Sequence, residues 1–155
     1  MIDFLKKLFH GKRIVYGTDY LTRFYLKGDG SGKSWELYLH RIYQEDGARK
    51  PHNHPWPWFL SIILSGWYVE ERDGFNAPAG VKPPWFVRRW INWMPSPAVF
   101  HRITVVSNRP VWTLVLVPAK TERQWGFLIR DEQGEPTFKR YSEMTLDDGV
   151  RVDHF

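Results

Sequence analysis

Residues 51–67, with the sequence PHNHPWPWFLSIILSGW, decide the fold. Two histidines stand two residues apart among three prolines, directly before a run of apolar and β-branched residues. Each proline disfavours helical backbone at the residue before it, so the segment is expected to be extended. Alternate residues of an extended chain point to the same side, and His52 and His54 should therefore project together. Residues 59–64 then predict a buried strand, and Ser65 and Gly66 predict a turn.

Strand signals also dominate the rest of the chain. Short runs of β-branched and aromatic residues are bounded by turn formers, a pattern that is typical of an all-β sandwich or barrel. The glycine-rich GDGSGK of residues 28–33 and the SNRP of residues 107–110 each indicate a hairpin. The other expected strands are residues 13–16, 20–26, 34–43, 67–72, 85–93, 99–106, 111–117 and 124–130, with a further short strand after residue 131.

Helix signals are confined to the ends of the chain. The apolar residues among residues 2–9 follow helical spacing, so they predict a short N-terminal helix. The length of 155 residues suits one domain, and the sequence shows no internal repeat and no linker. We therefore predict a single domain over residues 1–155, with its core in about residues 13–140.

Composition limits the chemistry that the protein can use. Hydrophobic residues make up 43% of the chain and aromatic residues 17%, which is enough for a packed core. There is no cysteine, so disulfides, thiolate metal sites and cysteine nucleophiles are excluded. A transition metal would have to be bound by histidine nitrogen or carboxylate oxygen.

The net charge and the composition of the first residues indicate the partners and the location of the protein. The net charge of +5 is dispersed, which favours solubility and also suits a protein that handles small anions. No helix-turn-helix signal or concentrated basic stripe is present, so nucleic acid is not expected as a partner. The first residues are too charged for a membrane span and lack the features of a signal peptide. We expect a cytoplasmic protein without a membrane partner.

Two further histidines lie on expected strands. His101 is the best candidate for a third metal ligand beside His52 and His54, since one metal needs donors from more than one strand. Strand parity then places Arg102 on the outer face. His40 lies on the expected strand 34–43 and could share the cavity face, where it would support a ligand, act as a fourth ligand or be a hydrogen-bonded structural residue.

These residues resemble the motifs of the cupin superfamily. Its first motif is H-x-H, three or four residues, glutamate, six residues and glycine, and here the paired histidines and Gly66 match it. Its second motif places a proline-containing turn before a histidine, as MPSPAVFH does in residues 94–101. The position of the glutamate holds Phe59, or Trp58 on the shorter spacing, and neither can bind metal. The resemblance covers about residues 35–127 and extends to small cupin-like proteins of phages and bacteria.

The resemblance carries expectations about fold and site. It implies a jelly-roll barrel, or double-stranded β-helix, that commonly forms homodimers. It implies a metal site of His52, His54 and His101, because cupin dioxygenases with three-histidine iron sites occur. An open face of three nitrogens suits a divalent Fe, Zn, Ni, Mn or Co ion, and some cupins have lost the metal altogether.

Several other residues are candidates for ligand binding. Trp56 and Trp112 could wall a ligand pocket, although core and rim packing is the ordinary role of tryptophan. Arg88 and Arg89 point in opposite directions, so one of them could face inward and clamp a carboxylate or phosphate. Glu70 and Glu71 alternate in the same way, and either is a candidate general base. His40 is also a candidate for ligand binding, because it could share the cavity face.

Three functions are compatible with these features. The first is a metal-dependent cupin enzyme of the oxygenase, isomerase or hydrolase type, such as a dioxygenase, acting on a small anionic molecule. The second is a non-catalytic binding module that sequesters a small ligand such as a nucleotide. The third is a structural protein with a degenerate barrel.

Overall fold

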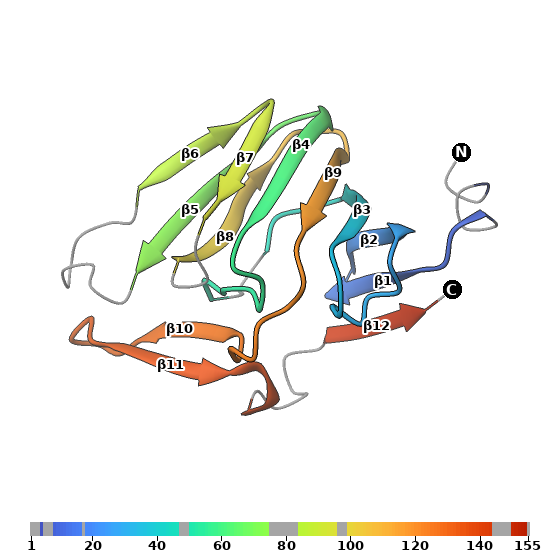
Figure 1. Cartoon of the computed structure of the whole chain (residues 1–155). Coiled ribbons are helices and arrows are strands. Elements are labelled where there is room, and N and C mark those ends of the chain that lie inside the picture. The colour runs from blue at the N-terminus through green and yellow to red at the C-terminus, as the bar shows by residue number, and fades with distance from the viewer. Residues whose placement is uncertain are drawn as a thin grey trace.

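The computed structural model contains two antiparallel sheets (Figure 1). Residues of both sheets line one cavity. The structure describes residues 4, 8–16, 18–46, 50–74, 84–95, 99–143 and 150–154. In the first sheet the strand order is β12-β1-β2-β3-β9-β4-β7. These strands are β12 (Val150–His154), β1 (Gly11–Tyr16), β2 (Thr18–Lys27), β3 (Glu36–Ile42), β9 (Val111–Val117), β4 (Phe59–Ser65) and β7 (Ile91–Met94).

The second sheet has two parts. One is ordered β6-β5-β8, with β6 (Trp85–Arg88), β5 (Tyr68–Gly74) and β8 (Val99–Val106), and the other is the hairpin of β10 (Gly126–Arg130) and β11 (Pro136–Arg140). A single turn of 3₁₀ helix, η1 (Tyr141–Glu143), follows β11. The all-β prediction is confirmed.

The extended segment 51–53 joins these two parts. His52 and His101 exchange two backbone hydrogen bonds, at N–O distances of 2.9 and 2.8 Å. On the other side the amide of Asn53 donates to the carbonyl of Gly126 at 3.1 Å. The segment therefore stands between β8 and β10 as a short strand, and the sheet pairing itself places His52 directly beside His101.

The core lies between the sheets in two apolar clusters. Burial alternates along β3 as the sequence predicts, with Glu36, Tyr38, His40 and Ile42 buried. The first cluster consists of Tyr20, Leu21, Ile42, Ile63, Tyr68, Ile103 and Val111. The second consists of Tyr25, Tyr38, Trp56, Phe59, Met94, Val115 and Val117.

Two of the local predictions are wrong. Residues 85–93 form two strands rather than one, since β6 pairs with β5 while β7 pairs with β4 in the other sheet. The SNRP turn does not close a hairpin, because β8 pairs with β5 and β9 pairs with β3 and β4. A turn signal shows where the chain bends, but it does not show whether the flanking strands pair or cross between sheets. The hairpin predicted at residues 28–33 is confirmed by the pairing of β2 with β3.

The predicted N-terminal helix falls mainly on residues outside the described ranges. Of residues 2–9, only 4, 8 and 9 are described; residues 4 and 8 have helical backbone, but no helix over 2–9 is among the elements that the described residues form. Within the described ranges, no helix has the length and the apolar character that a membrane crossing requires.

Candidate metal centre

The structure brings His52, His54 and His101 together. Each can offer one ring nitrogen such that these atoms all lie within 4.8 Å of one another. His54 Nε2 and His101 Nε2 are 2.8 Å apart, and the ring centroids of His52 and His101 are separated by 4.9 Å. Two of the residues come from the extended segment before β4 and one from β8, so the cluster depends on the pairing of residues 51–53 with β8.

Glu70 on β5 fixes the orientation of His101. Its Oε1 lies 2.7 Å from His101 Nδ1, which leaves the Nε2 lone pair directed at the other two histidines. His54 Nε2 and His101 Nε2 lie within hydrogen-bond distance, and in the neutral His101 tautomer with its proton on Nδ1 the Nε2 atom is the acceptor. A carboxylate behind a histidine is the arrangement that orients metal-binding imidazoles and raises their basicity.

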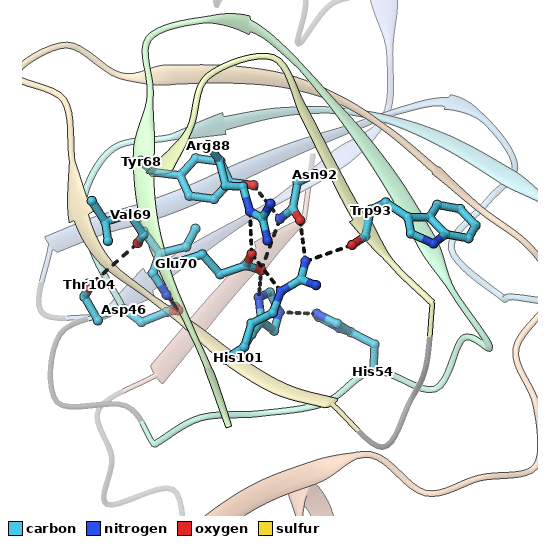
Figure 2. Close-up of polar contacts among 12 residues, drawn as sticks. Asp46, His54, Tyr68, Val69, Glu70, Arg88, Asn92, Trp93, His101 and Thr104 are labelled. Carbon is cyan, nitrogen blue, oxygen red and sulfur yellow. Dashed lines mark hydrogen bonds and ion pairs between the residues drawn. The ribbon is translucent and has the colours of Figure 1, made fainter. Parts of the chain in front are cut away.

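Glu70 in turn lies in a network of donors (Figure 2). Its side chain is fully buried, and its Oε2 accepts hydrogen bonds from Arg72 Nε at 3.0 Å and Arg88 Nε at 2.9 Å. The amide nitrogen of Asn92 donates to Oε1 at 3.1 Å and to the Tyr68 hydroxyl at 2.8 Å. Three donors from three residues, in addition to the histidine, therefore hold one carboxylate in place.

The charge state of Glu70 follows from these contacts. Burial alone would raise the pKa of Glu70, but the hydrogen bond with His101, the charge of Arg72 and the hydrogen bond from Asn92 outweigh it and lower the pKa to about 2. The carboxylate is thus ionised at neutral pH. A fixed negative charge behind His101 would stabilise a cation bound at its Nε2.

Aromatic side chains form the wall around His54. The ring of Trp56 stacks on His54 at 5.2 Å, and Phe59 meets it edge-on at 5.4 Å. Burial, with the neighbouring imidazoles of His101 and His52, holds the pKa of His54 well below its ordinary value. His54 is therefore neutral, which is the form that a metal ion binds.

The histidine cluster opens into a cavity of about 340 Å³, the size of a small-molecule site. Three buried polar atoms of lining residues have no hydrogen-bond partner in the described part of the chain: Asp46 Oδ1, Trp56 Nε1 and Thr113 Oγ1. Buried polar groups are normally satisfied, so these atoms indicate a place for a ligand or water. The donor set and the cavity together fit a metal site that is open to a second molecule.

The other predicted ligand-binding residues are found at different places. Trp56 and His40 line the cavity, but His40 lies outside the three-histidine cluster and accepts a hydrogen bond from Arg23 Nε at 2.8 Å. Arg88 points to Glu70 and Arg89 is exposed, so neither is among the described residues that line the cavity. Trp112 is not among them either; it faces the other side of β9, near Phe24. The predicted clamp by Arg88 or Arg89 and the predicted wall by Trp112 are thus not found in this cavity.

Sequence reasoning missed the cations that do line the cavity. Lys12, Arg23 and Lys120 are on its surface, and the first two come from strands at the far end of the sheet from β4. Arg23 stands directly opposite His40 in the β2–β3 pairing. The register of that hairpin reveals it, because the residue opposite His40 lies on the same face of the sheet as His40.

The comparison with known proteins shows that this chain is similar to several solved structures in its fold. A sugar phosphate isomerase of the cupin superfamily from Silicibacter pomeroyi DSS-3 matches with a TM-score of 0.52 and 15% identity, over 82% of both chains. The coconut allergen cocosin matches with a TM-score of 0.51 and 12% identity, over 75% of this chain and 35% of that one. A DMSP lyase from Ruegeria pomeroyi DSS-3 has 20% identity and a TM-score of 0.48, and this chain spans about half of it, 52%. No protein-family model matches the sequence, and no curated protein matches it.

These likenesses agree with the architecture. Two antiparallel sheets enclose a cavity, and the H-x-H segment enters the second sheet beside a histidine on β8. Gly66 lies in the left-handed region, with φ of 80°, at the turn after β4 where the first cupin motif has its glycine. The chain has the fold of the cupin superfamily.

Proposed function

We propose that the protein is a metal-dependent enzyme of the oxygenase, isomerase or hydrolase type that acts on a small anionic molecule. The observation that carries this proposal is the convergence of three histidine nitrogens, within 4.8 Å of one another, at the wall of a cavity. Three imidazole nitrogens suit divalent Fe, Zn, Ni, Mn or Co and leave coordination positions open.

The residues around the site have separable roles. His52, His54 and His101 would hold the ion, and Glu70 holds His101 in the tautomer that presents Nε2. A bound ion would act as a Lewis acid or activate water or dioxygen. Phe59, at the place of the cupin glutamate, packs against His54 and keeps that side of the site apolar.

Metal analysis tests the proposal. We expect protein purified without a histidine tag to contain about one divalent metal ion per chain after exposure to Fe, Zn, Ni, Mn and Co in turn. Binding of the preferred ion should raise the melting temperature, because the ion binds the folded state. Metal far below one per chain together with an unchanged melting temperature for all five ions would contradict the proposal.

A non-catalytic binding module is the second candidate. Phe59 in place of a carboxylate, the aromatic wall of Trp56 and Tyr38, and unpartnered polar atoms in the cavity favour capture of a planar ligand such as a nucleotide. A thermal-shift screen of nucleotides and small carboxylates, with and without metal, separates the two functions. Stabilisation without metal and recovery of the ligand unchanged would support the module, and metal-dependent turnover would support the enzyme.

We also propose a homodimer that forms through the outer face of the seven-stranded sheet. Ile62 and Leu64 on β4, and Ile91 and Trp93 on β7, are between 40% and 59% exposed on adjacent strands. Contiguous exposed apolar surface of this kind marks an interaction site. These side chains carry no charge, so two copies related by a twofold axis would bring no like charges together.

Light scattering tests the dimer. The wild type is expected to be dimeric at micromolar concentration, and Ile62→Glu should be monomeric because each copy would then place a charge in the apolar contact. Val105→Glu is the matched control, since Val105 has a similar exposure of 41% on β8 in the other sheet. A monomeric wild type, or an Ile62→Glu variant that stays dimeric, would rule out this interface.

A further inference from the structure

A row of polar side chains crosses the inner face of the seven-stranded sheet. Lys12 on β1 pairs with Arg23 on β2, Arg23 pairs with His40 on β3, and His40 pairs with Thr113 on β9. All four residues line the cavity. Tyr25, Tyr38 and Val115 of the second apolar cluster lie on one side of this row, and Leu21, Ile42 and Val111 of the first lie on the other.

Arg23 is held in a fixed position within this row. Its Nε donates to His40 Nε2 at 2.8 Å, and its guanidinium carbon lies 4.4 Å from the centre of the Tyr38 ring. Burial, with the charges of Arg23 and Lys12, holds the pKa of His40 well below its ordinary value, so His40 is neutral and acts as the acceptor. No ion pair joins Arg23 to a carboxylate of the described residues. The guanidinium is thus oriented without being neutralised.

Lys12 adds a second cation that lacks a counterion. It makes no hydrogen bond or ion pair with a side chain of the described residues. Burial, together with the positive charges of Arg23 and Lys120, lowers the pKa of Lys12 to about 8, while Glu36 acts in the opposite direction. With a pKa this close to neutral pH, Lys12 loses its charge easily in the folded protein, and a bound anion would stabilise the charged ammonium form.

The nearby carboxylate of Glu36 is already engaged. It accepts hydrogen bonds from the amides of Gly30 and Gly32 and from the Tyr38 hydroxyl. Lys120 lies beside the same turn, where its Nζ donates to the carbonyl of Gly30 at 3.0 Å. Asp46 is the carboxylate among the described lining residues, and it accepts from the amide of Ile103 in the first apolar cluster. The excess charge at the polar row is therefore positive.

We propose that Lys12, Arg23 and Lys120 form a subsite for an oxyanion, the phosphate or carboxylate group of the substrate. As a substrate subsite it rests on the proposed function, since it lies in the same cavity as the three histidines. The Trp56 ring lies 5.2 Å from the His54 ring and 5.9 Å from the guanidinium carbon of Arg23, so one small ligand can be held by its anionic group at the subsite and by another group at the metal. Thr113 Oγ1 and Trp56 Nε1 remain available as further partners. The substrate class is thus a small anion with a second polar group.

Anion binding to metal-free protein tests the subsite apart from the metal. Isothermal titration of tag-free, EDTA-treated protein with inorganic phosphate, and separately with acetate, is expected to give saturable binding that equal ionic strength of chloride does not reproduce. Lys12→Met and Lys120→Gln should each weaken binding about tenfold by removing one charge. Lys27→Met is the control, because Lys27 lies on β2 but is exposed and stacks on Trp35.

The outcomes separate this inference from the proposed function. Phosphate and acetate binding that is lost in Lys12→Met and Lys120→Gln, and retained in a His52→Ala/His54→Ala variant, supports the subsite whether or not metal binds. Stronger binding of phosphate than of acetate would point to a phosphorylated substrate, and the reverse to a carboxylic acid. Two results would overturn the subsite even if metal analysis succeeds. One is the absence of saturable anion binding in the wild type, and the other is anion binding by Lys12→Met and Lys120→Gln that is as tight as in the wild type.

A pH series gives a second readout. Sulfate keeps its charge between pH 7 and pH 9. The titratable and charged groups around Lys12 are Arg23, Lys120 and Glu36, with His154 opposite it on β12 and His40 beyond Arg23. Lys12 has a pKa of about 8 and loses its proton over that range. Sulfate affinity should therefore fall about tenfold from pH 7 to pH 9 in the wild type, and much less in Lys12→Met. An identical pH profile in both proteins would overturn the assigned role of Lys12.

Discussion

The Glu70→Gln variant is expected to bind metal about 10- to 100-fold more weakly than the wild type and to lose about 3 kcal/mol of unfolding free energy. The carboxylate accepts from His101, Asn92, Arg72 and Arg88. A glutamine has one acceptor oxygen, and its amide nitrogen would face at least one of these donors. Two arginine charges would also remain beside the site without their counterion, and His101 would lose the contact that fixes its tautomer.

Glu71→Gln provides the matched control for this experiment. Glu71 is the next residue on β5, and its carboxylate pairs with Arg102 on the opposite face, away from the histidines. For Glu71→Gln we expect a loss of about 1 kcal/mol of unfolding free energy and no change in metal affinity. Calorimetric titration with the preferred metal and urea unfolding of the metal-free proteins would measure the two effects separately. Equal metal affinities for the Glu70 and Glu71 variants would mean that Glu70 is a structural residue alone.

The Gly126→Ala variant is expected to lose about 3 kcal/mol or more of unfolding free energy. A Cβ atom at this position would lie 2.1 Å from the carbonyl oxygen of Lys139 and 2.9 Å from the Cα of Arg140, both in the backbone of β11. Backbone cannot rotate away as a side chain can, so the hairpin would have to open. Gly126 also donates its amide to the Asn53 side chain at 2.8 Å, which ties the H-x-H segment to β10.

Gly74→Ala is the control for the backbone contact. No atom of the described residues lies within 4 Å of a Cβ built at Gly74, so alanine there should be neutral or slightly stabilising. Urea unfolding would compare the two variants with the wild type. Gly126→Ala should also weaken metal binding, because the position of Asn53 determines how His52 and His54 are presented. A Gly126→Ala protein as stable as Gly74→Ala would contradict the close packing of β10 against β11.

Much of the fold was predictable because its signals are local. Proline and glycine mark the turns, and strict alternation along residues 36–42 predicted the two faces of β3, of which the structure buries that of Glu36, Tyr38, His40 and Ile42. The corner at Arg89 and Trp90 was missed, since residues 85–93 are strand-forming throughout and contain neither glycine nor proline. That corner moves the chain from β6 in one sheet to β7 in the other.

The candidate site was predictable in its histidines and less so in its surroundings. Spacing placed His52 and His54 on one side of an extended segment, and the resemblance to cupins supplied His101. The alternation of Glu70 with Glu71 left open which one points inward, and the structure shows Glu70 against His101. Alternation likewise allowed Arg88 to face inward, but its partner is Glu70 rather than a ligand in the cavity.

By itself the sequence determined the β class, the positions of most strands and the pair of neighbouring imidazoles, because each depends on residues close together in the chain. Only the tertiary structure decided which strands are neighbours, and with that the row of Lys12, Arg23, His40 and Thr113 across four strands. It also decided that Glu70 lies behind His101. Such contacts join residues that are distant in sequence, and they are set by strand register and by the packing of the two sheets, which no local pattern encodes.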